Sequence, residues 1–342
     1  MPLIEPNPDK TNSGENYNPA NSQSSLNGKG RFWVLGLIIL LFISGMAIVT
    51  EHDRTWTIWL SEHSWPGVIK FLRQTCFEGE GFGGTDSASF FIAASFFLYI
   101  FIWLKGEKTR LFKWRPYFGF IVTSSFFCGL FMVHSLKWFM GRARPGPVLN
   151  NAMDYSSWFE LGPHYVTEGI YRGSLPSGHT AEVMSFMTLA YILAANRKHS
   201  FPVRLLGFLF GVVALAYGII MALGCSMSLS HWITDCIFSI CIGWILIHVI
   251  YFWVLKIPEQ MEYYNKHGMH TQTPKLWELL FCVWAFFVAT GGMSIGLGFR
   301  SFWKQPVPWL ALLIPFGLFL VFFFGRKCIR LYSEVFKKIQ RI

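Results

Sequence analysis

Charged side chains are scarce in this chain. Only 14% of its 342 residues are Asp, Glu, Lys or Arg, whereas 53% are hydrophobic and 18% are aromatic. Soluble globular domains carry about 25% charged residues, so this composition excludes an ordinary soluble protein and predicts a polytopic membrane protein. The net charge of +10 does not indicate a nucleic-acid partner, because the sequence has no soluble domain that could present a basic face.

The seven cysteines do not predict a disulfide framework. Cys76 and Cys225 lie between apolar runs, and nothing in their spacing indicates that they pair. Four others fall within apolar runs, where cysteine usually packs as a small apolar residue. These four are Cys128, Cys236, Cys241 and Cys282. The fold must therefore be held together by apolar packing.

Long apolar runs are what the sequence has in abundance. Eight of them approach the roughly twenty residues that a helix needs to cross a bilayer. They cover residues 32–50, 87–104, 116–136, 180–195, 205–223, 232–255, 277–298 and 308–325. The fourth run is the shortest and the least hydrophobic. The sequence predicts an all-α fold, a membrane helical bundle with about eight transmembrane helices.

Basic residues are concentrated at one end of the predicted spans. They precede the first span and follow the second, fourth, sixth and eighth, so the positive-inside rule places both termini in the cytoplasm. The loops 51–86, 137–178, 224–231 and 299–307 then face the opposite side. Within the first of these loops, aromatic and aliphatic residues from Trp56 to Leu72 have helical spacing, which predicts an amphipathic surface helix or a short buried connector.

Four regions follow from this pattern. The first is a tail rich in Asn, Pro, Ser and Gly, which we expect to be disordered and cytoplasmic. A six-span core, a polar cytoplasmic linker and two additional spans with a basic cytoplasmic tail come after it. The regions cover residues 1–30, 31–255, 256–276 and 277–342, respectively.

The first polar motif is Lys137-x6-Arg144-Pro145. Lys137 and Arg144 are seven residues apart, so on a helix they would lie two turns apart on one face. Two such cations suit a phosphate group, because arginine adds a planar contact through two N–H groups. Basic residues that mark a membrane boundary are the alternative, but basic residues are scarce on this side of the membrane.

The second motif is Pro176-Ser177-Gly178-His179, directly before an apolar run. Glycine lets the backbone approach an anion closely, and the Ser177 hydroxyl could add a donor. His179 would then lie beside the anion, where an imidazole can donate a proton to a leaving oxygen. The alternative is an ordinary helix N-cap with a structural histidine.

The third motif is His231-x3-Asp235. Residues four apart are neighbours on a helix. A carboxylate that accepts one imidazole N–H fixes the tautomer and leaves the other ring nitrogen free to attack phosphorus. The alternative is a structural hydrogen-bonded pair, although ionisable residues at the start of a span are candidates for function.

Together, the three motifs resemble those of the type 2 phosphatidic acid phosphatase family of integral membrane lipid phosphatases, over about residues 130–250. The resemblance implies that four residues bind phosphate, namely Lys137, Arg144, Ser177 and Gly178. It also implies that His179 is the general acid, that His231 is the nucleophile forming a phosphohistidine, and that Asp235 orients it. It implies no metal and no cofactor, and the sequence has no metal-ligand spacing that argues otherwise.

Two positions of the third motif depart from the family. The family's third motif is Ser-Arg-x5-His-x3-Asp, and here Gly224 and Cys225 replace its serine and arginine. Loss of one such donor lowers a rate about a hundredfold or more. Arg142 and Arg172 are candidate substitute cations. Without a substitute, we expect a slow enzyme or an inactive phosphate binder.

The resemblance predicts a metal-independent phosphatase that hydrolyses a phosphomonoester or pyrophosphate of a membrane lipid on the non-cytoplasmic face. A catalytically impaired lipid-phosphate-binding or transport protein and a lipid phosphotransferase are the alternatives. The sequence Gly-Arg-Ala-Arg-Pro at residues 141–145 is similar to that of bacterial members of the family, including those that act on lipid A. This similarity favours a bacterial inner membrane with a periplasmic site. The particular lipid and the oligomeric state stay open.

Overall fold

A computed structural model describes residues 28–76, 79–161, 172–196, 198–267, 274–302 and 308–340. Every regular element in these ranges is helical and none is a strand, which confirms the all-α prediction. The expected disordered tail at residues 1–30 lies almost wholly outside the described residues, and only its last three residues are seen, at the start of α1 (Gly28–Thr50).

Seven helices in the described ranges are long and apolar enough to cross a membrane. Besides α1, they comprise α4 (Asp86–Lys105), a long arm, α10 (Phe201–Met227), α11 (Ile233–Val249), α13 (Trp277–Ser301) and α14 (Leu313–Gln340). The arm consists of α5 (Arg115–Ser125), the π-helical turn η5 (Phe126–Val133) and α6 (His134–Met140). The protein is therefore an integral membrane protein.

The remaining run expected to span the membrane, residues 180–195, is broken into short pieces. It forms α8 (Gly178–Val183), a 3₁₀ turn (Met184–Phe186) and α9 (Met187–Ala194). α8 packs against α10 and α11, and α9 packs against α10 and α5. Val183 and Met184 are fully buried, so this segment is packed inside the bundle.

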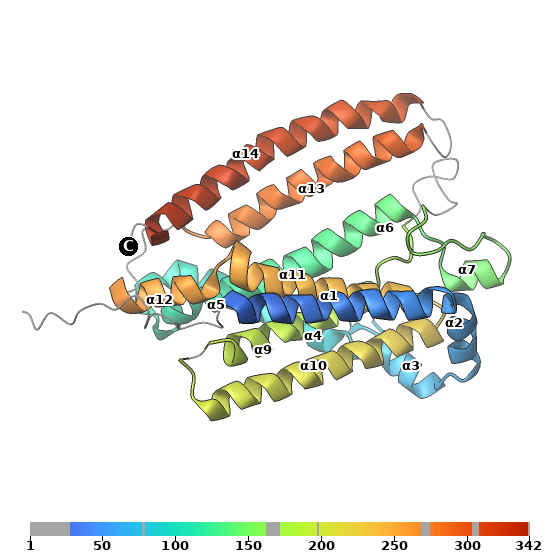
Figure 1. Ribbon diagram of the computed structural model, residues 1–342, viewed down its shortest axis with the longest axis horizontal. Helices are drawn as coiled ribbons and strands as arrows, with labels where there is room; N and C mark the ends of the chain where they lie inside the picture. Colours follow the sequence, from blue (N-terminus) through green and yellow to red (C-terminus); the bar gives the residue numbers. More distant parts are fainter. Residues whose placement is uncertain are drawn as a thin grey trace, which may run out of the picture.

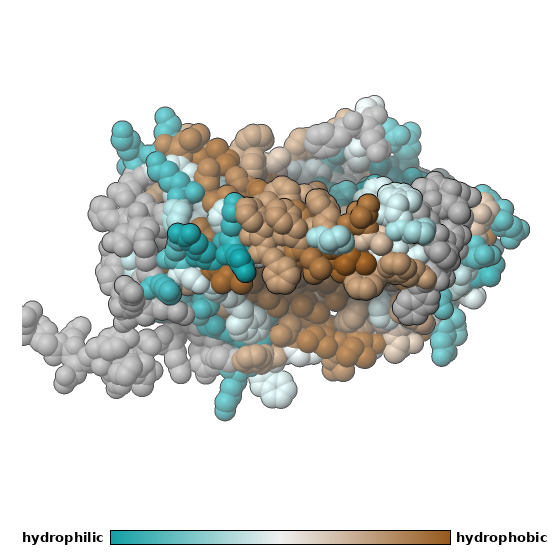
Figure 2. Space-filling model, turned by 90° about the horizontal axis from the view of Figure 1, so that it is seen from above, coloured by the Kyte–Doolittle hydropathy of each residue, from teal (hydrophilic) through white to brown (hydrophobic). Residues whose placement is uncertain are grey.

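The helices run mostly along the long axis of the molecule (Figure 1). α1 packs beside α11, and α13 and α14 form an antiparallel pair along one edge, joined to the bundle through contacts of α13 with α5 and α6. On the face shown in Figure 2, hydrophobic residues cover much of the central part and hydrophilic residues gather toward both ends. The start of α1 and the end of α14 lie at the same end of the bundle in Figure 1.

Two short helices close the opposite end of the bundle. They are α2 (Asp53–Glu62) and α3 (Pro66–Arg73), and both pack against α10 (Figure 1). Trp59 and Trp65 are exposed, whereas Leu72 is buried against α10. The segment expected to form an amphipathic helix is thus two helices with one buried face. The polar motifs lie at this same end.

Candidate active site

The three motifs meet at one cavity of about 620 Å³. Its walls come from α6, the start of α8, the end of α10 and the loop before α11. The motif residues that line it are Lys137, Arg144, Gly178, His179, Cys225 and His231. Residues up to 94 positions apart in the sequence thus face a single space, as the phosphate-site interpretation requires.

Lys137 and Arg144 reach the cavity from different local structures. α6 ends at Met140, and Gly141 takes the left-handed conformation with φ of +57°, which glycine adopts without strain. Arg144 follows in an extended segment and is the N-cap of α7 (Pro145–Leu149). The expectation of one continuous helical face was therefore wrong. The two cations converge because the chain turns at Gly141.

Arg172 also lines the cavity, and the backbone beside it is tightly fixed. The Gly173 N–H donates to the Lys137 carbonyl at 3.0 Å, and the Ser174 N–H donates to the Arg142 carbonyl at 2.8 Å. A Cβ at position 173 would lie 2.5 Å from the backbone nitrogen of Arg142, so only glycine lets the two backbone segments lie this close together. The pairing places Arg172 on the same wall as Lys137.

His231 lies just before α11, in the loop that follows α10. Its Nδ1 is 3.7 Å from Oδ2 of Asp235, and this buried nitrogen has no hydrogen-bond partner within the described residues. Oδ2 of Asp235 instead accepts from the Trp232 N–H at 3.0 Å and caps the helix. The two residues are neighbours through this cap and not through a shared helical face, which corrects the expected geometry.

Burial lowers the pKa of His231 to about 4. The imidazole is therefore neutral at pH 7, the form that a histidine nucleophile needs. The distance of 3.7 Å to the carboxylate is longer than a hydrogen bond. Such contacts often tighten only when substrate binds.

Arg142 does not line the cavity. Its guanidinium is fully buried and donates from Nη1 to Asp235 Oδ1 at 2.6 Å and from Nη2 to Asp53 Oδ2 at 2.8 Å. Its Nε donates to the Ser156 carbonyl at 2.9 Å. Because its nitrogens are occupied here, Arg142 is not a substitute for the missing motif arginine. It holds Asp235 behind His231.

Asp53 is a residue that the sequence interpretation missed. Its Oδ1 accepts from the Thr234 N–H at 3.0 Å, and its Oδ2 accepts from the Thr234 hydroxyl at 2.6 Å. It therefore joins the end of the first span to the start of α11. The available signal was an acidic residue directly after a span, on the same side as the motifs.

Ser177 is also placed away from the cavity. Its hydroxyl is buried and lies 2.9 Å from the Thr180 hydroxyl, and its N–H donates to the Asp235 carbonyl at 3.4 Å. Ser177 is the N-cap residue of α8. The neighbouring Gly178 does line the cavity, so the second motif presents its glycine and histidine to a ligand.

The cavity also has residues that no motif predicted. Arg73 and Glu182 add charge to its lining, and Ile92 of α4 and Leu130 of η5 give it an apolar wall. Leu130 is 43% exposed on the outer surface of the bundle. The cavity thus combines a cationic end with a hydrophobic side, a combination that suits an amphiphile.

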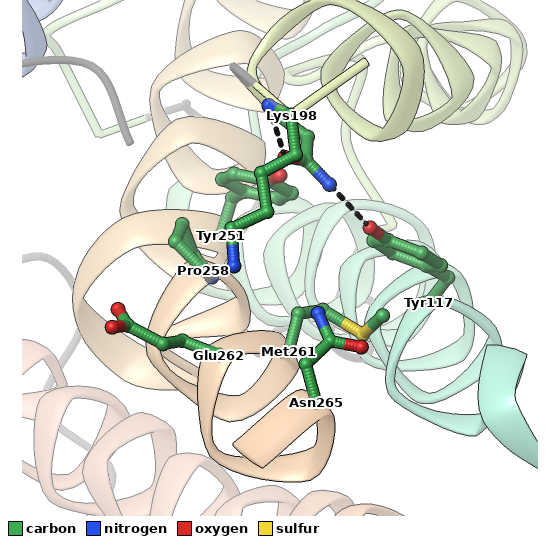
Figure 3. Close-up of a pocket in the computed structure, with 8 residues that line it drawn as sticks. Tyr117, Lys198, Tyr251, Pro258, Met261, Glu262 and Asn265 are labelled. Carbon is green, nitrogen blue, oxygen red and sulfur yellow. Dashed lines mark hydrogen bonds between the residues drawn. The ribbon is translucent and has the colours of Figure 1, made fainter. Parts of the chain in front are cut away.

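Figure 3 shows a separate small pocket. It lies between α12 (Ile257–His267) and the ends of α5, α9 and α11. There the Asn196 side-chain amide donates to the Tyr117 hydroxyl at 3.2 Å. Its volume of about 10 Å³ holds no more than one water molecule. The cavity at the motifs is therefore the candidate active site.

Residues 116–259 match the family model of the PAP2 superfamily. The match covers all three motifs and the walls formed by α6, α8 and α10, and it excludes α3, α13 and α14. No curated protein and no solved structure matches the chain.

Proposed function

We propose that the chain is a lipid phosphatase, because residues 116–259 of this integral membrane protein match the family model of the PAP2 superfamily. It hydrolyses a phosphomonoester or pyrophosphate of a lipid at the end of the bundle that carries the motifs. The observation that carries this proposal is the position of His231, which shares one cavity with Lys137, Arg144 and His179 and has a carboxylate 3.7 Å behind its Nδ1.

The first step is the transfer of the phosphoryl group to His231. The free Nε2 attacks phosphorus while the bond to the lipid oxygen breaks, and His179 donates a proton to that leaving oxygen. The imidazole becomes positively charged, and Asp235 stabilises the Nδ1–H. Lys137 and Arg144 neutralise the phosphoryl oxygens.

The second step is hydrolysis of the phosphohistidine. Water attacks phosphorus, His179 accepts its proton, and the P–N bond breaks to return neutral His231 and release inorganic phosphate. The same histidine thus acts as acid and then as base. A lipid hydroxyl in place of water would make the reaction a phosphotransfer.

The lining of the cavity supports a lipid substrate. Besides its cations, the lining includes the apolar side chains of Ile92 from α4 and Leu130 from η5. A phosphate headgroup at His231 would leave its hydrocarbon chain beside this apolar wall. The motifs lie at the end of the bundle opposite the basic segments that precede the first span and follow the even-numbered spans. By the positive-inside rule, this position supports a non-cytoplasmic site. The site would be periplasmic in a bacterial inner membrane.

Phosphate release by the purified protein tests the proposal. The assay uses a panel of lipid phosphates in detergent with a chelator present, and compares the native chain with His231→Ala. We expect release from one lipid class, loss of release in the variant, and an acid-labile phosphohistidine in the native chain. Label on an acceptor lipid would identify a phosphotransferase, and lipid binding without release would identify an impaired binder.

A further inference from the structure

Cys225 leaves the α10 wall of the cavity without a cation of its own. It is buried at the cavity surface together with His179 and His231. Lys137 belongs to α6, Arg172 to the segment paired with it, and Arg144 to the start of α7, where the Gly146 N–H donates to the Leu229 carbonyl of the loop after α10. The third-motif position on α10 itself therefore offers no guanidinium to a phosphoryl group at His231, unless another element supplies one beside Cys225.

We propose that Arg73 of α3 supplies this missing guanidinium and contacts the transferred phosphoryl group from the α10 wall. The role of Arg73 in phosphoryl transfer rests on the proposed function. Arg73 lines the same cavity as Cys225 and His231, and it lies outside the region that matches the superfamily. The chain thus replaces a cation of the third motif with one from a different helix.

The contact between α3 and α10 explains how Arg73 reaches this position. Leu72 is buried in one cluster with Met221 and Cys225. A Cβ at position 224 would lie 2.4 Å from Cδ1 of Leu72, so Gly224 lets α3 lie directly on α10. The two departures from the family motif, Gly224 and Cys225, are therefore linked: both are small, and α3 occupies the space beside them.

The end of α3 is held firmly while the Arg73 side chain is exposed at the cavity. The Gly84 N–H donates to the Phe71 carbonyl at 2.9 Å, and the Thr85 hydroxyl donates to the Leu72 carbonyl at 3.4 Å. Within the described part of the chain, the Arg73 guanidinium makes no hydrogen bond or ion pair. A fixed backbone with an uncommitted guanidinium suits a group that binds an anionic ligand.

Arg73 and Arg172 act on different residues of the cavity. The charges of Lys137 and Arg73 both act on Cys225 and on His179. The charge of Arg172 acts on Lys137 and His134 of α6. Arg73 therefore adds to Lys137 a second cation at the Cys225 position, and this one comes from α3.

A set of variants tests this assignment in the phosphate-release assay. Arg73→Ala should lower kcat about a hundredfold or more, the loss expected for one donor to the transferred group. Cys225→Arg should restore most of the rate in the Arg73→Ala background. Lys70→Ala is the matched control, because Lys70 is exposed one turn earlier on α3 and does not line this cavity. Rates within about threefold of native for Arg73→Ala would overturn the assignment.

Binding of inorganic phosphate, measured by titration calorimetry, separates this proposal from the proposed function. If the native chain releases no phosphate but binds the ion, and Arg73→Ala binds it at least tenfold more weakly than Lys70→Ala does, the Arg73 site stands and the phosphatase proposal fails. If the native chain is active and both variants match it in rate and phosphate affinity, the phosphatase proposal stands and the Arg73 site is wrong. A native chain that neither releases nor binds phosphate overturns both.

Discussion

Nη1 of Arg142 donates to Oδ1 of Asp235 at 2.6 Å, and both side chains are fully buried. A second carboxylate, Asp53, lies 2.8 Å from the other terminal nitrogen of the same guanidinium. One guanidinium thus forms ion pairs with two buried carboxylates directly behind the proposed nucleophile. This arrangement fixes the Asp235 carboxylate before any substrate arrives, and it makes Arg142 a positioning residue.

Arg142→Ala should destabilise the protein by about 3–5 kcal/mol, because it removes the cation that is ion-paired with two buried carboxylates. Thermal unfolding in detergent measures the effect. Arg172→Ala serves as the control, since that side chain is exposed and its removal uncovers no buried charge. Equal unfolding temperatures for the two variants would contradict the structural role of Arg142.

Asp235→Asn should lower kcat roughly 10³–10⁴-fold with little change in KM, because an amide cannot stabilise the imidazolium that forms when His231 attacks. The amide oxygen can still accept from the Trp232 N–H but not from Arg142 at the same time, so thermal unfolding of the variant must first show that the fold survives loss of this ion pair. Steady-state kinetics on the best lipid substrate measure both constants. A comparable rise in KM with unchanged kcat would instead assign Asp235 to substrate binding.

The pH dependence of kcat/KM should report the buried state of His231. Burial lowers the pKa of His231 to about 4, and only the neutral imidazole attacks phosphorus. In the acidic limb that belongs to His231, activity is therefore lost as the pH falls through about 4, not through the ordinary value near 6.5. Rate measurements from pH 3.5 to 7 test this. An acidic limb near 6.5 that belongs to His231 would show that the site is more open to water.

Ser177→Ala should lower the rate by less than about tenfold, even though the family resemblance makes Ser177 a phosphate binder. Its hydroxyl faces Thr180 and does not line the cavity, so its removal costs only one buried hydrogen bond, about 1 kcal/mol. Lys137→Ala is the comparison, because Lys137 lines the cavity and its loss should reduce the rate far more. Similar losses in both variants would show that Ser177 rotates toward the ligand during the reaction.

Much of the fold and part of the site could be predicted from sequence. Apolar runs longer than a bilayer crossing give the helices directly, and the shortest run, at 180–195, is the one that the structure breaks into pieces. The motif residues Lys137, His179 and His231 converge because each lies at the same end of a span. That convergence follows from topology alone.

The parts that could not be predicted depend on contacts between distant segments. Arg142 and Asp53 are 89 residues apart, and no local spacing indicates their pairing. At Gly141 the helix could either continue or end in a left-handed residue, and residue types alone do not distinguish these two conformations. Arg73 acquires its position only because α3 packs over Gly224, a tertiary contact.

The Asp53 contact also defines the smallest piece of the chain that can assemble the site. The region that matches the superfamily begins at residue 116 and includes every motif residue, yet Asp53 reaches Arg142 and Thr234 from outside it. A fragment that starts at residue 116 would keep its catalytic groups but lose one of the two anions that balance the buried guanidinium. The site as it is built here therefore extends back at least to α2, and any split or fused version of this protein must keep Asp53 beside Arg142 and Thr234.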